Sequence, residues 1–305
     1  MSKIAFLFPG QGAQVVGMGK DFYDQFEVSK KIFDLASEAS GLDVPKLCFT
    51  ENEELNITEY TQTALLATEI AILKVVLEKG IKPDYAAGLS LGEYGAVSTA
   101  GAIEDKDLFS LIRKRGIYMQ EAYPVGGAMM AVLGLDADTI AKICEETEGI
   151  VSIANDNCPG QIVITGEEAA VLKAGEKLTE AGAKRCIQLK VSGPFHSALL
   201  KNAADQLRDE LKNVEIKDIK VPYISNVNAE VIEDKSLIKE LLANQVCSQV
   251  RFRETILLLK ELGVTTFVEI GPGKTLAGFV KKTDKELEVI NIATVEDLEK
   301  LNALL

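Results

Sequence analysis

A serine flanked by glycines is the residue with the clearest catalytic potential in this chain. Gly88-Leu89-Ser90-Leu91-Gly92 matches the G-x-S-x-G pattern, with an apolar strand-like segment before it and a helix-like segment after it. In that context the pattern predicts a tight strand-to-helix turn that projects the serine hydroxyl above the edge of a sheet as a nucleophile. The N–H of Leu91, at the start of the helix, would then point toward an oxyanion. A glycine-flanked structural turn is the alternative interpretation.

His196 is the only histidine among 305 residues, so a serine nucleophile has a single imidazole available as its base. In hydrolases an acidic residue between the serine and the histidine usually orients the imidazole ring. A backbone carbonyl could serve instead, because no acidic residue in this interval has a distinctive context. The acidic candidates are Asp105, Asp107, Asp136, Asp138 and Asp156.

A glycine-rich loop follows the first apolar strand-like segment. Pro9-Gly10-Gln11-Gly12 lacks the Gly-Lys pair at the spacing that a phosphate-binding loop requires. The loop is therefore either a structural turn or a tight loop that offers the N–H of Gln11 as a second oxyanion donor.

Two arginines lie in a predicted helix that follows the serine motif. Arg113 and Arg115 are two residues apart, so their side chains point about 200° apart and one of them can face inward. A buried guanidinium beside a serine nucleophile would bind a substrate carboxylate as a bidentate pair.

Short apolar strands alternate with amphipathic helices along the chain, which favours an α/β fold with a mainly parallel, hydrolase-like sheet and helices on both faces. Residues 1–125 and 192–305 are predicted to form this large domain, and residues 126–191 follow the order β-α-β-β-α-β of an inserted ferredoxin-like subdomain. The predicted strands are 4–8, 84–89, 127–135, 150–155, 161–165, 184–191, 220–225, 265–270 and 288–292, and the predicted helices are 20–40, 58–79, 91–100, 108–121, 137–148, 169–181, 198–211, 236–245, 252–262 and 274–283.

Composition excludes several classes of function. A single histidine and the lack of a Cys-x-x-Cys pair argue against a zinc site, so no metal is expected. The formal net charge of -13 argues against nucleic-acid binding. The longest apolar stretch, Ala64–Leu77, is interrupted by Glu69 and Lys74 and is too short and too polar to span a membrane, and no signal peptide is expected. Five scattered cysteines favour reduced thiols and a cytoplasmic location.

Several motifs together resemble those of the malonyl-CoA:acyl carrier protein transacylases of fatty acid synthesis, which are related to the acyltransferase domains of polyketide synthases. The resemblance covers nearly the whole chain, and the motifs occur in the family's order. The matching segments are Phe8-Pro9-Gly10-Gln11-Gly12, Gly88-Leu89-Ser90-Leu91-Gly92-Glu93-Tyr94, Arg115-Gly116 with Met119-Gln120, Asn157-Cys158-Pro159-Gly160-Gln161, Pro194-Phe195-His196-Ser197 and Glu269-Ile270-Gly271-Pro272-Gly273.

The resemblance implies a role for each matching residue. Ser90 would be the nucleophile that accepts the malonyl group, and His196 would be its general base. The main-chain N–H groups of Gln11 and Leu91 would stabilise the oxyanion, and Arg115 would pair with the free malonyl carboxylate.

Further roles follow from the same resemblance. The main-chain carbonyl of Gln245 would orient the histidine, and Met119, Asn157 and Phe195 would line the substrate pocket. The ring of Phe195 would favour malonyl over methylmalonyl, because it leaves less room for an extra methyl group. The chain departs from the family pattern at Leu89, where a histidine is common.

The implied activity is ping-pong transfer of malonyl from malonyl-CoA to the phosphopantetheine thiol of acyl carrier protein, through a malonyl-serine, by a cytoplasmic monomer without a cofactor. A trans-acting polyketide acyltransferase, a serine esterase or thioesterase, and a non-catalytic carrier-protein-binding module are the alternatives. An acidic carrier protein would need a locally basic surface. The candidates are Lys184-Arg185, Lys190, Arg251–Arg253 and Lys281-Lys282.

Overall fold

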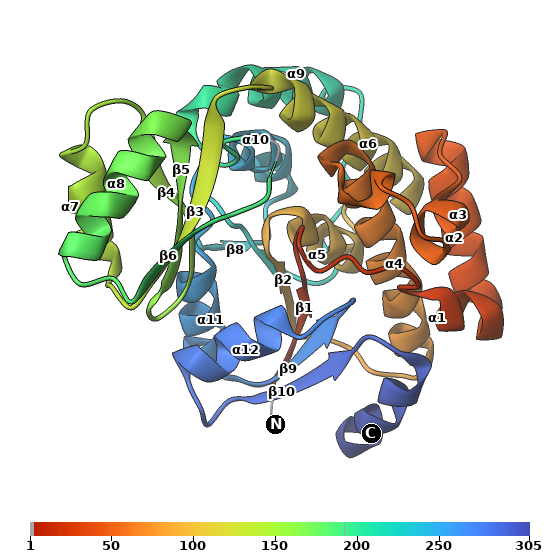
Figure 1. The fold of residues 1–305 in the computed structure, drawn as a ribbon. Coiled ribbons are helices and arrows are strands. Elements are labelled where there is room, and N and C mark those ends of the chain that lie inside the picture. The colour runs from red at the N-terminus through yellow and green to blue at the C-terminus, as the bar shows by residue number, and fades with distance from the viewer. Residues whose placement is uncertain (1–2, 192) are drawn as a thin grey trace.

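The computed structural model describes residues 3–191 and 193–305, and Figure 1 shows their arrangement. The strands are β1 (Lys3–Phe8), β2 (Tyr85–Gly88), β3 (Gly127–Leu133), β4 (Val151–Cys158), β5 (Gln161–Glu167), β6 (Arg185–Gln188), β7 (Tyr223–Ile224), β8 (Val231–Ile232), β9 (Val264–Ile270) and β10 (Glu288–Ile292). The helices are α1 (Lys20–Gln25), α2 (Glu27–Ser40), α3 (Val44–Phe49), α4 (Thr58–Glu78), α5 (Glu93–Ala100), α6 (Asp105–Ala122), α7 (Ala137–Glu145), α8 (Glu168–Glu180), α9 (Lys201–Leu211), α10 (Ile238–Gln245), α11 (Phe252–Glu261) and α12 (Thr275–Thr283).

These strands form two separate sheets. The larger has the order β10-β9-β1-β2-β7-β8, and the smaller has the order β4-β5-β3-β6. The smaller sheet is antiparallel and, with α7 and α8, has the β-α-β-β-α-β order predicted from the sequence (Figure 1). The predicted limits at residues 1 and 192 lie outside the described residues, and the division of the chain at 125/126 and 191/192 stays a prediction.

The large sheet is parallel through its centre and therefore places several loops at one edge. β1 pairs in parallel with β2 on one side, where Phe8 is opposite Gly88, and with β9 on the other. Only the pairing of β7 with β8 is antiparallel in the part of this sheet that the structure describes. Because the carboxyl ends of parallel strands share an edge, the loop with Gln11 and the turn with Ser90 lie next to each other.

Side chains of β1 alternate between two apolar layers. Phe6 and Phe8 pack into a core with α2, α4, α5 and α6, whereas Ala5 and Leu7 pack into a second core with α11 and α12. A strand covered by helices on both faces needs apolar residues at every position, which explains the continuous run in the sequence.

The long helix α4 is the central element of the first core. Its length and composition would allow it to cross a membrane, but 83% of its most apolar window is buried inside the fold. Of the charged residues within it, Lys74 pairs with Asp105 at 2.6 Å, whereas Glu69 is fully buried and has no hydrogen-bond partner among the described residues. Burial raises the pKa of Glu69 well above its usual range.

The structure corrects several predicted segments. The predicted helix 20–40 is two helices, because Phe26 adopts an extended conformation with φ −126° and ψ 119°. The predicted strand 150–155 ends too early, since β4 continues through Cys158 and leaves Pro159-Gly160 as the turn. Helix α3 was not predicted, although Asp43 caps its start and a proline follows in the first turn, a pattern typical of helix starts.

The predicted ends of three strands are also wrong. β3 ends at Leu133, β6 extends only from Arg185 to Gln188, and β7 contains only Tyr223 and Ile224. β8 and the 3-10 segment Val295–Leu304 were not predicted. Strands as short as β6, β7 and β8 lack a periodic pattern of apolar residues, so the local sequence does not define their ends.

Glycines at the serine turn are required by close backbone contacts. A Cβ at Gly92 would lie 2.0 Å from the carbonyl oxygen of Phe8, and one at Gly88 would lie 2.0 Å from the carbonyl carbon of Gly92. Gly278, on an exposed part of α12, has no heavy atom within 4 Å of its would-be Cβ.

We expect Gly92→Ala to lower the free energy of unfolding by about 3 kcal/mol, because backbone must move away from the added methyl group. The same change at Gly278 should raise it by roughly 0.5–1 kcal/mol, since alanine reduces the entropy lost in helix formation. Urea unfolding of both variants checks this. Equal stabilities would contradict the tight contact between the turn and β1.

Candidate active site

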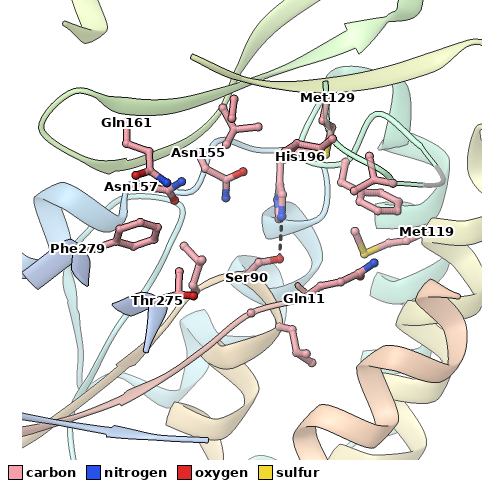
Figure 2. Close-up of a pocket in the computed structure, with 18 of the residues that line it drawn as sticks. Gln11, Ser90, Met119, Met129, Asn155, Asn157, Gln161, His196, Thr275 and Phe279 are labelled. Atoms are coloured by element: carbon pink, nitrogen blue, oxygen red, sulfur yellow. Dashed lines mark hydrogen bonds between the residues drawn. The ribbon is translucent and has the colours of Figure 1, made fainter. Parts of the chain in front are cut away.

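Ser90 and His196 meet at the carboxyl edge of the large sheet. Ser90 begins the 3-10 turn η2 (Ser90–Gly92) directly after β2, and His196 precedes the turn η3 (Ala198–Leu200). The Oγ of Ser90 lies 2.7 Å from Nε2 of His196 (Figure 2). Both residues have positive φ angles, 55° and 60°, which residues with a side chain rarely adopt. The predicted pair is therefore in contact, and both backbones are strained at the point of contact.

Asn226 holds the strained serine turn in place. Its Oδ1 accepts the N–H of Ser90 at 2.7 Å, and its Nδ2 donates to the carbonyl oxygen of Gly88 at 2.7 Å. One side chain thus satisfies backbone groups on both sides of Leu89. This contact is one way in which the fold offsets the cost of the unusual conformation.

The histidine ring is oriented by a main-chain carbonyl. Nδ1 of His196 lies 2.9 Å from the carbonyl oxygen of Gln245, which can only accept a hydrogen bond. Nδ1 therefore carries the proton, and Nε2 is free to accept the proton of Ser90.

No carboxylate hydrogen-bonds the ring of His196 within residues 3–191 and 193–305. Two of the acidic candidates are used elsewhere, since Asp156 pairs with Arg253 at 2.8 Å and Asp136 caps α7. Of the two orienting groups that the sequence left open, the structure shows the carbonyl.

Burial controls the charge of the histidine. His196 is 4% exposed, and its burial together with the nearby Arg115 guanidinium lowers its pKa from 6.5 to about 4. The ring is therefore neutral near pH 7, which is the form that a general base requires.

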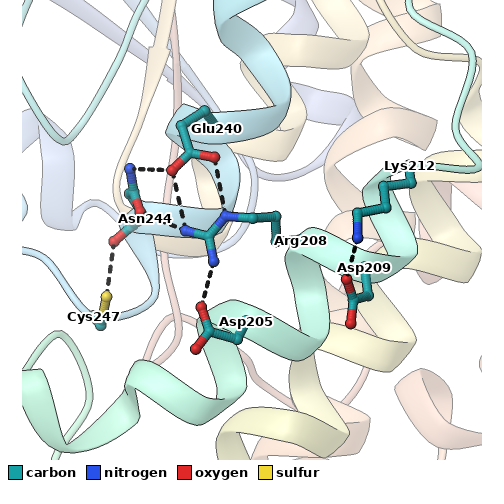
Figure 3. A network of polar contacts seen from close by, with 7 residues as sticks. All are labelled: Asp205, Arg208, Asp209, Lys212, Glu240, Asn244 and Cys247. Atoms are coloured by element: carbon teal, nitrogen blue, oxygen red, sulfur yellow. Dashed lines mark hydrogen bonds and ion pairs between the residues drawn. The ribbon is translucent and has the colours of Figure 1, made fainter.

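A network of surface side chains holds the end of α10, which contains the Gln245 carbonyl that contacts His196. Figure 3 shows Arg208 of α9 reaching Glu240 and Asn244 of α10, at distances of 3.0 Å from Nε to Glu240 and 2.9 Å from Nη2 to Asn244. Asn244 directly precedes Gln245 at the end of α10. The pairs are partly exposed, so each contributes little energy, but the two-pronged contact between Arg208 and Glu240 orients α10 against α9.

Arg115 is the arginine that faces inward. It is 1% exposed, whereas Arg113 turns outward to Glu59 at 2.8 Å. Its Nη2 lies 3.1 Å from the Oγ of Ser90 and 2.8 Å from Oε1 of Gln245, and its Nη1 donates to Gln62 at 2.7 Å. The prediction that one of the two arginines points inward is confirmed.

The Gln11 loop packs directly on the serine turn. A Cβ at Gly10 would lie 2.6 Å from the carbonyl oxygen of Leu89, so only glycine allows this approach. The Gln11 side chain donates to Oγ1 of Thr58 at 2.9 Å, which anchors the loop to α4. The N–H of Ser90 is taken by Asn226, and Gln11 and Leu91 line the same cavity as Ser90.

A cavity of about 280 Å³ opens above the hydroxyl of Ser90 (Figure 2). Met119, Asn157 and Phe195 line it, and so does Leu89, the residue at which the serine motif departs from the family pattern. Arg115 and Gln245 do not line it but lie behind the wall, where their side chains contact each other. The lining residues that were not predicted are Gly10, Gln62, Met129, Ala131, Asn155, Gln161, Val163, Leu189, Val191, Thr275 and Phe279.

Two buried polar residues of the site, Gln62 and Asn226, were not predicted from the sequence, and Glu93 was quoted in the serine motif without a role. Gln62 stands in Thr61-Gln62-Thr63, a polar interruption of an apolar helix, and Asn226 follows the strand β7 at the carboxyl edge of the sheet. Both positions are signals that could have been used. Among the described residues there is no group of three or more His, Cys, Asp or Glu side chains that could hold a metal ion.

Comparison with known proteins relates almost the whole chain to one family. Residues 5–301 match the acyl transferase domain. A malonyl CoA-acyl carrier protein transacylase of Bacillus subtilis (strain 168) is 50% identical over 304 residues, which cover 98% of this chain and 96% of the relative. The protein of the same name from Staphylococcus aureus (strain MRSA252) is 41% identical, with 99% of each chain covered.

Solved structures agree with this relation. The crystal structure of a malonyl CoA-acyl carrier protein transacylase from Clostridium perfringens superposes with a TM-score of 0.96 at 46% identity, covering 99% of this chain and 97% of the other. A malonyl-transacylase in complex with its type II PKS acyl-carrier protein superposes with a TM-score of 0.95 at 41% identity and covers 98% of both chains.

We expect the imidazole of His196 to titrate near pH 4. The single histidine permits a direct measurement by NMR, and Arg115→Gln should raise the pKa because it removes the cationic neighbour. The imidazole takes up a proton below about pH 6.5 in the unfolded chain, but only below about pH 4 in the folded protein. The histidine therefore lowers the free energy of unfolding as the pH falls from 6.5 to 4.

The control is His196→Gln. In this variant the free energy of unfolding should lose the part of its pH dependence that comes from the histidine, while the part from the carboxylates remains. An imidazole pKa of about 6.5 or higher would contradict the burial argument.

Proposed function

This chain belongs to the acyl transferase domain family, and we propose that Ser90, His196 and Arg115 carry out its reaction. The enzyme transfers the malonyl group of malonyl-CoA to the phosphopantetheine thiol of acyl carrier protein in fatty acid synthesis, by a ping-pong mechanism. One observation supports the residue roles above all others. The Oγ of Ser90 contacts both a neutral imidazole nitrogen, at 2.7 Å, and a buried guanidinium, at 3.1 Å.

In the first half-reaction His196 is the base and then the acid. Its Nε2 accepts the proton of Ser90 as Oγ attacks the thioester carbonyl of malonyl-CoA. The N–H groups of Gln11 and Leu91 stabilise the resulting oxyanion. The C–S bond then breaks, the leaving thiolate of CoA takes the proton from His196, and the malonyl group remains as an ester on Ser90.

The second half-reaction reverses these steps with a different thiol. His196 accepts the proton of the phosphopantetheine thiol, whose sulfur attacks the malonyl ester. When the ester bond breaks, His196 returns the proton to the oxygen of Ser90. The carbonyl of Gln245 keeps Nδ1 protonated throughout, so Nε2 remains the nitrogen that exchanges protons.

Arg115 is suited to bind the free carboxylate of the malonyl group. Its partners within the described residues are neutral, namely Gln62, Gln245 and Ser90, and its Nε has none. A buried guanidinium without a paired anion gains strongly from a carboxylate that reaches it. Acylation also removes the serine proton and places the malonyl chain next to this cation.

The residues at the cavity mouth support a docking surface for the carrier protein. Lys282, near the end of α12, donates to Gln161 in the cavity wall at 2.8 Å, and Phe279 of the same helix lines the cavity. By contrast, Arg251 and Arg253 are paired with Glu254 and Asp156. We therefore place the basic docking surface at Lys281-Lys282 rather than at these arginines.

Several broader features belong to the same proposal. The large sheet is hydrolase-like, supported by the serine on a turn between β2 and α5. No cofactor takes part, because the malonyl group is held in ester or thioester bonds throughout. A monomer in the cytoplasm is supported by a site built within one chain and by five cysteines that are all free.

We expect incubation with malonyl-CoA to add the mass of one malonyl group to the protein, as measured by intact mass spectrometry. Ser90→Ala should abolish the adduct because the nucleophile is gone. His196→Ala should slow its formation by about 10³-fold or more, because no other histidine can replace it. A pantetheine thiol should then remove the adduct as a malonyl thioester.

Other outcomes identify the alternatives. Hydrolysis of malonyl-CoA without transfer to the thiol would indicate an esterase or thioesterase. Full function of Ser90→Ala would indicate a non-catalytic binding module, and a preference for a polyketide carrier over the fatty acid carrier would indicate a trans-acting polyketide acyltransferase.

Arg115→Ala should lower kcat/KM for malonyl-CoA by about 100-fold and lower it much less for acetyl-CoA, which has no carboxylate to bind. Arg113→Ala is the matched control. Arg113 is also an arginine of α6, but it lies on the opposite side of the helix and pairs with Glu59. An unchanged preference for malonyl in Arg115→Ala would refute the carboxylate-binding role.

A further inference from the structure

Glu93 is a buried carboxyl behind the serine turn that the reaction steps do not use. It is 0% exposed and begins α5, immediately after Gly92. Its Oε2 accepts hydrogen bonds from Nε2 of Gln245 at 2.5 Å and from the N–H of Asn226 at 3.2 Å. Its Oε1 has no hydrogen-bond partner in the described part of the chain. A buried acid is costly to retain, so its contacts indicate what it does.

Gln245 connects this carboxyl to the groups of the reaction. Its side-chain Oε1 accepts from Arg115 at 2.8 Å, and its Nε2 donates to Glu93 and, at 2.8 Å, to the carbonyl oxygen of Ser90. Its main-chain carbonyl oxygen lies 2.9 Å from Nδ1 of His196. One fully buried residue thus contacts the nucleophile segment, the base and the guanidinium.

The orientation of the Gln245 amide follows from the charges at its two ends. Arg115 can only donate hydrogen bonds, so it requires the amide oxygen. Oε2 of Glu93 and the carbonyl of Ser90 accept, so they require the amide nitrogen. A reversed amide would place two donors together at the Arg115 end and acceptors together at the other end. Three acceptors surround the amide nitrogen, including Oδ1 of Asn226 at 3.4 Å, and Glu93 provides the shortest of these contacts.

We infer that Glu93 is a positioning residue that acts through Gln245: its carboxyl oxygen holds the Gln245 amide so that Oε1 faces the Arg115 guanidinium and the main-chain carbonyl stays on His196. The inference rests on the proposed function, in which Arg115 binds the malonyl carboxylate. It assigns part of the selectivity for an acidic acyl group to a residue that touches neither the substrate nor the nucleophile hydroxyl.

This role does not depend on whether Glu93 is ionised. Burial raises its pKa to about 7, partly offset by hydrogen bonds from Gln245 and Asn226 and by the Arg115 charge. Tyr94 and Tyr223 also face this group, and both hydroxyls are buried and neutral. In the neutral acid the proton belongs on Oε1, which has no partner, so Oε2 accepts in either state. A neutral side chain with an oxygen at the same place should therefore replace Glu93.

The test compares Glu93→Met with Glu93→Gln. The two side chains have similar length, but only glutamine keeps an oxygen that can accept from Gln245. We expect Glu93→Met to lower the ratio of acylation by malonyl-CoA to acylation by acetyl-CoA about tenfold, because Arg115 loses its fixed partner. Glu93→Gln should keep the ratio within about threefold of the wild type.

Glu69→Met and Glu69→Gln are the matched controls, since Glu69 is equally buried and has no hydrogen-bond partner among the described residues. They should change the melting temperature without changing the ratio. If Glu93→Met does not fold, Glu93→Asp takes its place, because the shorter side chain withdraws the oxygen from Gln245. A folded Glu93→Met with the wild-type ratio, or a Glu93→Gln that loses as much as Glu93→Met, would overturn the inference.

A second measurement needs no substrate. The NMR signal of the Nδ1 proton of His196 reports its bond to the carbonyl of Gln245, and it should move in Glu93→Met but not in Glu93→Gln. A wild-type protein that forms no malonyl adduct would sink the proposed function, whereas this signal would still test the role of Glu93. A malonyl preference that survives Glu93→Met, with an unmoved signal, would overturn only the role of Glu93.

Discussion

The contact between the Oγ of Ser90 and Nε2 of His196 is the interaction on which the rest of the site depends. It forms only because both residues adopt positive φ angles, a conformation that the local chain does not favour. The parallel edge of the large sheet supplies the position, and glycines at 88 and 92 allow the turn to pack on β1. Asn226 and the carbonyl of Gln245 then hold the serine turn and the imidazole in place.

Burial gives these polar groups their chemical character. The histidine is neutral at pH 7 because it is buried and lies near a cation, so its lowered pKa leaves Nε2 unprotonated. Arg115 stays charged in the same region, with neutral partners and the Glu93 carboxyl beyond the Gln245 amide. A buried cation without a paired anion is energetically unfavourable, and in the proposed reaction the malonyl carboxylate would pair with the Arg115 guanidinium. Under the proposed role of Arg115, stability and selectivity for malonyl would depend on the same buried charge.

Much of the fold was predictable because its signals are local. The apolar run at residues 4–8, the glycine-flanked serine and the β-α-β-β-α-β order each depend on short-range patterns, and the structure contains all three. The predictions failed where an element is short or where tertiary contacts decide. The extended conformation of Phe26 divides one predicted helix, and β4 continues to Cys158, beyond the predicted end of the strand at residue 155.

By itself the sequence determined which residues could take part: a single histidine leaves one imidazole base, and G-x-S-x-G identifies one serine as the candidate nucleophile. It also narrowed the inward guanidinium to Arg113 or Arg115, because residues two apart on a helix cannot share a face. Residue patterns alone left open whether an acidic residue or a carbonyl orients His196, since every residue has a carbonyl and none has a distinctive sequence. The family resemblance implied the carbonyl of Gln245, and only the tertiary structure shows that contact. The same holds for Gln62 and Asn226, whose positions in the site come from packing between distant segments rather than from any neighbour in the chain.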